Sequence, residues 1–157
     1  MQEGNMRLLI VVRHGNYDDE YNLSPKGREQ MQKLAESLQS LTNGNKVLLL
    51  SSTAKRASQS AEVISQMLSV SFEEHEILWS ENCHPENKPS LLEFVRARKQ
   101  EAEIVILITH LEYADSFPAY FAREELKINL GNTWPPEPEK GQACLIDCIS
   151  KSFQLLP

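Results

Sequence analysis

The chain has few of the features that mark specialised protein classes. It holds three cysteines in 157 residues, and Cys83, Cys144 and Cys148 lack the spacing of a metal site. The apolar runs are too short to cross a bilayer, and the polar MQEGN stretch before Met6 is unlike a signal peptide. We therefore expect a protein of a reducing, cytoplasmic compartment, with Cys144 and Cys148 as small core residues rather than a redox pair.

Positive side chains are also fewer than negative ones: 16 Lys and Arg and 22 Asp and Glu give a net charge of −6. Nucleic acids and anionic membranes bind clusters of Lys and Arg, so we expect neither of them as a partner. An acidic chain can still hold a cationic pocket, which leaves small anionic substrates open. The sequence contains no P-loop glycine pattern and no carboxylate cluster for magnesium, so it predicts chemistry without a metal or another cofactor.

What is present is the composition of a globular domain, 41% hydrophobic and 24% charged, and the length predicts a single domain over 1–157. Apolar runs alternate with stretches of helical periodicity, without an internal repeat. We expect strands at 8–12, 46–52, 69–74, 103–110, 142–150 and 152–157, and helices at 22–41, 53–68, 90–102 and 111–124. This alternation predicts an α/β fold, a three-layer α/β/α sandwich with a mainly parallel central sheet.

Local signals refine these helices. Ser24 followed by Pro25 is a good N-cap and first helical position. Gly27 in the first turn is unexpected, because glycine costs about 1 kcal/mol relative to alanine inside a helix. Pro118 predicts that the helix over 111–124 starts late or kinks. Trp134 lies in a Pro-rich loop, where we interpret it as a packing anchor, with a cover over a pocket mouth as the alternative.

Charged side chains follow three of the apolar runs. Arg13 and His14 come directly after the first strand, and Arg56 lies in the first turn of a helix that Ser52 could cap. His110 follows the fourth strand and precedes another helix. Taken singly, each has a simpler interpretation: a strand end, a surface arginine or a satisfied buried histidine. Because ligands bind outside the carboxyl ends of parallel strands, their convergence at one edge of the sheet favours a site.

The residue types indicate phosphoryl chemistry. Two guanidinium groups offer planar, permanently charged forks that fit phosphate oxygens, and the N-termini of the following helices add N–H donors. A neutral histidine can act as a nucleophile towards phosphorus. A second, protonated histidine can hold an equatorial oxygen as charge redistributes in the transition state.

Several motifs in this order resemble the histidine phosphatase superfamily, also called phosphoglycerate mutase-like. They are Arg13-His14-Gly15, NLSPKGREQ at 22–30, SSTAKRASQSAEVI at 51–64 and VILITH at 105–110. The resemblance implies the phosphoglycerate mutase-like fold and accounts for Gly27. It also implies that His14 is transiently phosphorylated while Arg13, Arg56 and His110 form the phosphate pocket. In size the chain looks most like the small phosphohistidine phosphatases.

The chain departs from the family pattern at three places. Asn16 stands where many members have Glu, and we count it as a substrate-binding candidate. Thr109 replaces the Gly or Ser that usually precedes the second histidine. The family's proton donor has no clear counterpart: Glu81 is the first candidate and Glu86 the second, with a solvated loop as the equal alternative for Glu81. His75 and His84 are interpreted as surface residues.

Together these observations predict a metal-independent phosphatase. It would hydrolyse a phosphate monoester or phosphohistidine, carried by a phosphorylated small molecule or a phosphohistidine protein, through a phosphohistidine on His14. One alternative is a mutase that returns the phosphoryl group to the substrate. The other is a catalytically silent relative that only binds a phosphorylated ligand.

Overall fold

Strands and helices alternate along the chain in the computed structural model, which describes residues 5–80, 84–131 and 134–157. The elements in chain order are β1 (Leu8–Arg13), α1 (Pro25–Thr42), β2 (Val47–Ser51), α2 (Lys55–Leu68), β3 (Phe72–Glu74), a 3₁₀ turn (Glu76–Leu78), α3 (Lys88–Arg98), β4 (Ile104–Thr109), α4 (Leu111–Glu124), β5 (Ala143–Asp147) and β6 (Ser152–Leu156). Every strand and helix expected from the sequence is therefore present, with shifted ends. Within the described ranges, no helix has both the length and the apolar character needed to span a bilayer.

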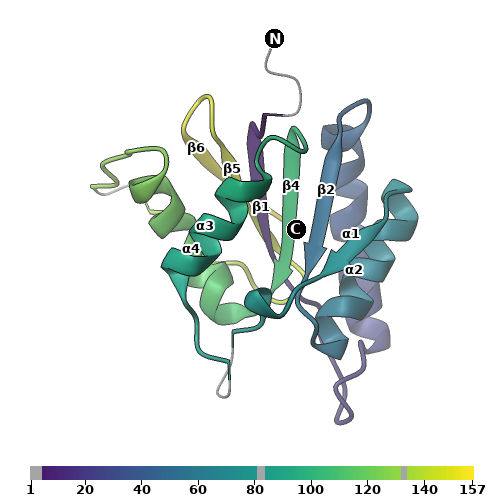
Figure 1. The fold of residues 1–157 in the computed structure, drawn as a ribbon. Coiled ribbons are helices and arrows are strands. Elements are labelled where there is room, and N and C mark those ends of the chain that lie inside the picture. The colour runs from purple at the N-terminus through teal and green to yellow at the C-terminus, as the bar shows by residue number, and fades with distance from the viewer. Residues whose placement is uncertain (1–4, 81–83, 132–133) are drawn as a thin grey trace.

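The strands form one mixed sheet in the order β3-β2-β4-β1-β5-β6. The first four strands of the chain run parallel, β5 runs antiparallel to β1, and β6 runs antiparallel to β5. Helices α1 and α2 cover one face and α3 and α4 the other, as Figure 1 shows. The predicted α/β sandwich is confirmed.

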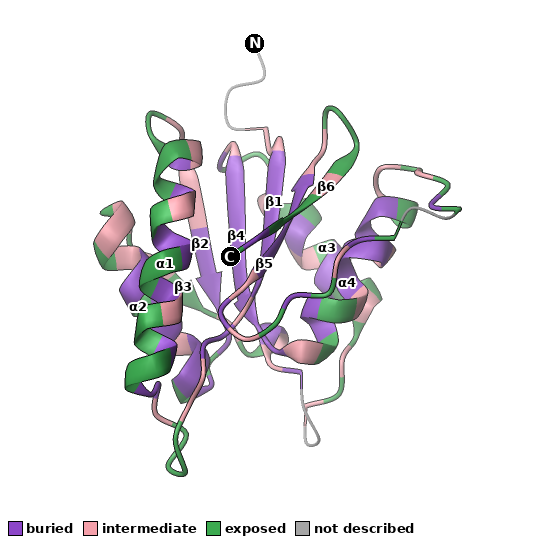
Figure 2. Cartoon of the chain, turned by 180° about the vertical axis from the view of Figure 1, so that it is seen from behind, coloured by how far each residue is buried: buried purple, intermediate pink, exposed green. Residues whose placement is uncertain are grey.

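The core lies on both faces of this sheet, and β1 supplies both. Leu8, Ile10 and Val12 pack into the cluster beneath α1 and α2. Leu9 and Val11 point the other way, into the cluster beneath α3 and α4. Because successive side chains of a strand alternate between faces, a central strand covered on both sides must be apolar throughout. Figure 2 shows β1 and β4 almost entirely in the buried colour, whereas the outer side of α1 is exposed.

The helix signals are partly confirmed. The Ser24 hydroxyl accepts a hydrogen bond from the Gly27 N–H at 3.0 Å, and α1 begins at Pro25 as predicted. Pro118 lies inside α4, which begins at Leu111, so the late start is wrong. Proline lacks an N–H donor, yet α4 stays continuous because its buried aromatic face packs on the sheet.

The cysteines of the last strands agree with their expected role. Cys144 is buried in β5, and Cys148 is half-buried just beyond its end; both are free thiols. Burial raises the pKa of the Cys144 thiol to about 12. Burial, with Asp147 and Glu125 nearby, raises the pKa of the Cys148 thiol to about 11. Both thiols are therefore protonated at neutral pH, as expected of core residues.

Candidate active site

The structure brings the side chains from three strand ends together at the carboxyl edge of the sheet. Strand register aligns Arg13 of β1 with Thr109 of β4, so His14 and His110 leave neighbouring strands at the same level. Their rings meet edge to face with centroids 5.1 Å apart. Arg56 Nη2 lies 3.5 Å from His110 Nδ1. His14, Arg56 and His110 are only 5%, 3% and 1% exposed.

His14 is held in one orientation. Its Nδ1 lies 2.9 Å from the Gly15 carbonyl oxygen, which can only accept, so Nδ1 carries the proton and Nε2 keeps its lone pair. Burial, together with the positive charges of Arg56, Arg13 and Lys140, lowers the pKa of His14 to about 4 against the opposing effect of the Gly15 hydrogen bond. At neutral pH the ring is therefore uncharged and can act as a nucleophile at Nε2.

The loop that carries His14 is locked to α1 and α2. The Gly15 N–H donates to Ser60 Oγ at 3.0 Å, and the Ser60 hydroxyl donates to the Arg56 carbonyl at 2.7 Å. A Cβ on Gly15 would come within 2.8 Å of the Gly27 carbonyl oxygen, and a Cβ on Gly27 would overlap the Asn16 carbonyl. The glycine that looked costly in the first turn of α1 is thus required by the close approach of the His14 loop.

His110 is positioned by Ser52, which the sequence suggested as a helix cap. The Ser52 hydroxyl lies 2.9 Å from His110 Nε2 and accepts from the Ala54 N–H at 3.1 Å. Ser52 does not cap α2: the N-cap is Ala54, which has no side-chain hydrogen bond. The expectation of a Ser52 cap is wrong because its hydroxyl reaches across to β4.

Arg13 retains unused donor capacity. Its Nη1 donates to the Pro138 carbonyl at 3.4 Å. Its Nε is buried and finds no hydrogen-bond acceptor in the part of the chain that is described. A buried guanidinium N–H without an acceptor is unfavourable unless an anion binds it. This is the feature of the site that most directly favours an anionic ligand.

The remaining sequence candidates lie in different surroundings. The Asn16 side chain donates to Ser24 Oγ at 2.9 Å, which ties it to the start of α1. Glu86 accepts from Lys88 at 3.1 Å and from the Ser116 hydroxyl at 2.8 Å. Glu81 lies outside the described residues. Sequence reasoning missed Glu112, a carboxylate in the first turn of α4 that accepts from the Ser80 hydroxyl at 3.3 Å.

Aromatic side chains next to the histidines were also missed. The Tyr17 ring lies 5.4 Å from the His14 ring, and the Trp79 ring lies 6.0 Å from the His110 ring. His84, expected at the surface, is partly exposed, stacks on Trp79 at 4.3 Å and lies 3.7 Å from the Glu76 carboxylate. His75 is partly exposed and pairs with Glu73 at 2.9 Å, which agrees with a surface role. Tyr17 stands three positions after His14, and this adjacency was the available sequence signal.

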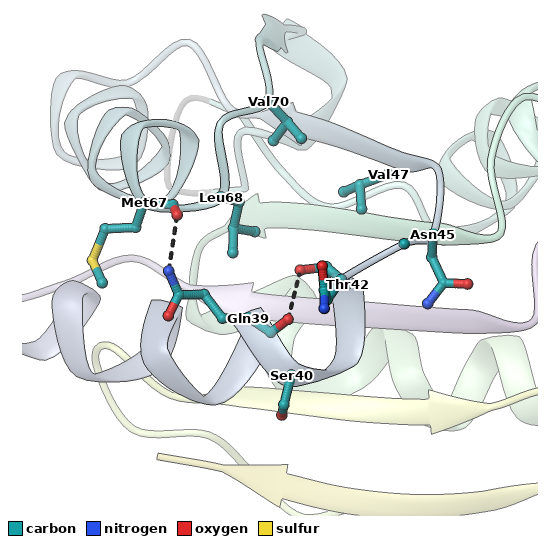
Figure 3. A pocket seen from close by; sticks show the side chains of 10 residues that line it. Gln39, Ser40, Thr42, Asn45, Val47, Met67, Leu68 and Val70 are labelled. Atoms are coloured by element: carbon teal, nitrogen blue, oxygen red, sulfur yellow. Dashed lines mark hydrogen bonds between the residues drawn. The ribbon is translucent and has the colours of Figure 1, made fainter.

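A cavity of about 580 Å³ lies away from these residues, at the amino end of β2. Its walls are the last turns of α1 and α2 and the start of β2, and none of its lining residues titrates. Figure 3 shows Gln39 reaching across it to the Met67 carbonyl, a hydrogen bond of 3.0 Å. This cavity offers no chemistry. Over the described residues, no cluster of three His, Cys, Asp or Glu side chains could hold a metal ion.

Comparison with known proteins agrees with this geometry. Residues 9–80 match the family model described as histidine phosphatase superfamily (branch 1), so the predicted resemblance is confirmed for this part of the chain. The matched region contains β1, α1, β2 and α2, and therefore Arg13, His14 and Arg56. No curated protein matches the whole sequence significantly.

Solved structures share the fold over nearly the full length. A protein histidine phosphatase SixA complexed with tungstate has a TM-score of 0.73 and 18% identity, covering 94% of this chain and 93% of its own. A mycobacterial glucosyl-3-phosphoglycerate phosphatase has a TM-score of 0.63 and 19% identity, covering 95% and 96%. A phosphoglycerate mutase from Plasmodium falciparum has a TM-score of 0.60 and 20% identity, covering 98% and 90%. The fold is phosphoglycerate mutase-like.

Proposed function

We propose that the protein is a phosphatase that hydrolyses a phosphate monoester or a phosphohistidine through a covalent intermediate on His14. The observation that carries this proposal is a buried, neutral His14 whose Nε2 is unprotonated and whose neighbours are cationic. Arg13, Arg56 and His110 are the proposed phosphate ligands. Phosphatases among the structures of similar fold support the reaction class.

In the proposed first step, His14 Nε2 attacks phosphorus and forms a P–N bond. The bond from phosphorus to the leaving group breaks, and the leaving group keeps the electron pair and takes a proton from an acid. The His14 ring gains positive charge, which the Gly15 carbonyl stabilises through its hydrogen bond to Nδ1. The guanidinium groups and His110 hold the oxygens of the transferring group.

In the second step, water attacks the same phosphorus and gives up a proton to the conjugate base of that acid. The P–Nε2 bond breaks, its electron pair returns to His14, and inorganic phosphate leaves. Transfer to water distinguishes a phosphatase from a mutase, which would return the phosphoryl group to the substrate. The two alternatives would use the same pocket. A mutase would replace the second step by transfer to the substrate, and a silent phospho-ligand binder would carry out neither step.

The nucleophile is tested with His14→Ala and a matched histidine control, His75→Ala. We expect His14→Ala to abolish hydrolysis of an aryl phosphate and the acid-labile phosphate trapped on the protein. His75→Ala should keep both, because His75 pairs with Glu73 outside the pocket. Near-normal turnover by His14→Ala would refute the mechanism. Absence of turnover and of trapped phosphate in the unmodified protein would favour the silent binder.

The proton donor is tested by comparing leaving groups. We propose Glu81 from the sequence, and Glu112 is the described carboxylate two positions after His110. Removing the true acid by Glu→Gln should lower turnover of alkyl phosphates by about 10²–10⁴-fold. Aryl phosphates should lose much less, because a phenolate leaves without full protonation. Glu86→Gln tests the second sequence candidate in the same way, and Glu93→Gln, an exposed carboxylate that pairs with Arg96 on α3, is the matched control. Equal losses on both substrates would assign a structural role instead.

We also propose that the reaction needs no metal and takes place in a reducing, cytoplasmic compartment. Two arginines and a second histidine supply the positive charge that a metal would otherwise provide. The free thiols of Cys144 and Cys148 are compatible with that compartment. A chelator should leave turnover unchanged; activity lost to the chelator and restored by a divalent ion would refute metal independence.

A further inference from the structure

A continuous array of aromatic rings crosses the candidate site. It runs from Tyr21 through Tyr17, His14, His110 and Trp79 to His84. Neighbouring centroids are between 4.3 and 6.0 Å apart. The histidine pair occupies the middle of the array. Among the described residues, the next aromatic rings beyond the pair are therefore Tyr17 on one side and Trp79 on the other.

On the Tyr17 side, cations fix the ring in place. The Arg56 guanidinium carbon lies 5.0 Å from the Tyr17 centroid, and Lys140 Nζ lies 4.8 Å from it. Cations over a ring face are attracted by its quadrupole. Tyr17 thus forms a positioned wall beside the proposed nucleophile rather than a mobile surface side chain.

Tyr21 extends this wall outward. Its ring stacks on Tyr17 at 5.9 Å and is 56% exposed, so it is no part of the core. The Tyr21 backbone has a φ of 66°, which is unfavourable for a non-glycine residue. Asp18 supports this turn, since its carboxylate accepts from the Glu20 and Asn22 N–H groups at 2.9 and 3.0 Å. The Arg56 guanidinium carbon lies 5.5 Å from the Tyr21 centroid, so the loop holds this exposed ring against a cation of the candidate site.

On the opposite side, Trp79 presents a second flat surface. Its ring is nearly parallel to those of His110 and His84, with interplanar angles of 14° and 10°. A cavity of about 390 Å³ borders Trp79, His84 and Tyr113. This cavity is large enough for a ring-sized group, and its other lining residues are Glu76, Ile77, Pro85, Asn87 and Ser90.

We propose that the site selects phosphoryl groups carried on a planar aromatic ring, which packs against Tyr17 and Trp79. This inference rests on the proposed function, because it concerns the leaving group of that reaction. Tyr17 contacts the His14 ring and Trp79 contacts the His110 ring, so a leaving group that extends past the histidine pair on either side would meet one of these rings. Stacking favours a flat unsaturated ring over a saturated ring of equal size. The ring can be a phenol or an imidazole.

The test separates binding of the ring from leaving-group chemistry. Phenylphosphonate and cyclohexylphosphonate carry the same head group on a P–C bond that is not hydrolysed. As competitive inhibitors of aryl phosphate hydrolysis, phenylphosphonate should bind roughly 2- to 10-fold more tightly, the range expected for an aromatic contact beyond burial of area. Tyr17→Leu and Trp79→Leu should each lower this ratio towards one, whereas Tyr17→Phe should preserve it.

Trp134→Leu is the matched control for an exposed aromatic residue. The Trp134 ring contacts Arg123 in the last turn of α4, and the backbone of Arg123 is about 20 Å along the helix axis from His110 by the rise per residue. The ratio should not change in this variant, and the alternative interpretation of Trp134 as a pocket cover then fails as well.

A ratio of one in the unmodified protein, with hydrolysis intact, would overturn the inference and leave the proposed function standing. So would a ratio that survives in both leucine variants. If the unmodified protein neither hydrolyses aryl phosphates nor binds vanadate, the proposed function is overturned, and the inference with it. Turnover of phenyl phosphate against N-phosphoimidazole then distinguishes a phenol from an imidazole as the preferred ring.

Discussion

Lowering the pH from 7 towards 4 should destabilise the folded protein through His14. Its pKa is about 4 in the folded chain against 6.5 for an unperturbed histidine, chiefly because the ring is buried. Between these values the unfolded chain binds a proton that the folded chain does not, so stability rises with pH across the window and falls as acid is added. The difference between 6.5 and about 4 corresponds to roughly 3 kcal/mol in the free energy of unfolding.

The assay is chemical denaturation at fixed pH values from 7 to 4.5, in phosphate-free buffer, for the unmodified protein and for His14→Asn. An asparagine can still donate a hydrogen bond to the Gly15 carbonyl but does not titrate. Carboxylates with lowered pKa, such as Glu73 and Asp147, are present in both proteins and cancel in the comparison. The variant should therefore lose less stability than the unmodified protein, by about 2–3 kcal/mol at the acid end.

Identical pH dependence in the two proteins would refute the reasoning, since it would mean that His14 titrates alike when folded and unfolded. A larger loss in the variant would refute it too. Inorganic phosphate offers a second check. A bound anion stabilises the folded state by mass action, so midpoints should rise with phosphate in the unmodified protein.

Three further outcomes follow from the contacts of the site. Gly27→Ala should lower the melting temperature, because its Cβ overlaps the Asn16 carbonyl and such overpacking typically costs about 1–3 kcal/mol. Ser52→Ala should reduce kcat by up to about tenfold and also lower the melting temperature, because His110 Nε2 and the Ala54 N–H both lose a buried hydrogen-bond partner. Ser60→Ala should lower both kcat and the melting temperature, since the Gly15 N–H and the Arg56 carbonyl lose their hydrogen-bond partner together. Steady-state kinetics measures the effect on kcat, and thermal denaturation measures the effect on stability.

The fold was predictable because its central strands are buried on both faces. The segments at 8–12 and 104–108 read as unbroken apolar runs, and only a covered parallel strand requires that pattern. The edge elements depended on weaker signals. β3 keeps only three residues of its expected stretch, since it contacts a single neighbouring strand, and the start of α4 was misjudged because tertiary packing outweighed Pro118.

The candidate site could be predicted from topology where its residues directly follow a strand, whereas Arg56 came from the motif at 51–64. Arg13, His14 and His110 follow apolar runs directly, so parallel topology alone brings them to one edge. Ser52 looked like a helix cap because its neighbours in sequence permit that role. Its partner is 58 residues away, and a single-sequence pattern carries no information on that contact. Tyr17 and Trp79 were missed for the same reason: their positions are set by loops rather than by periodicity.

The net charge of the chain and the charge of its pocket have opposite signs, and the topology explains how both arise. A net charge of −6 is spread over the exposed helices and loops. Arg13, Arg56 and Lys140 come from three separate segments, yet all act on the one buried ring of His14 and lower its pKa. Three cations around a neutral histidine repel one another, and a phosphoryl dianion would relieve that repulsion. In the proposed mechanism, the burial that lowers the pKa of His14 would also keep the nucleophile uncharged when an anion arrives.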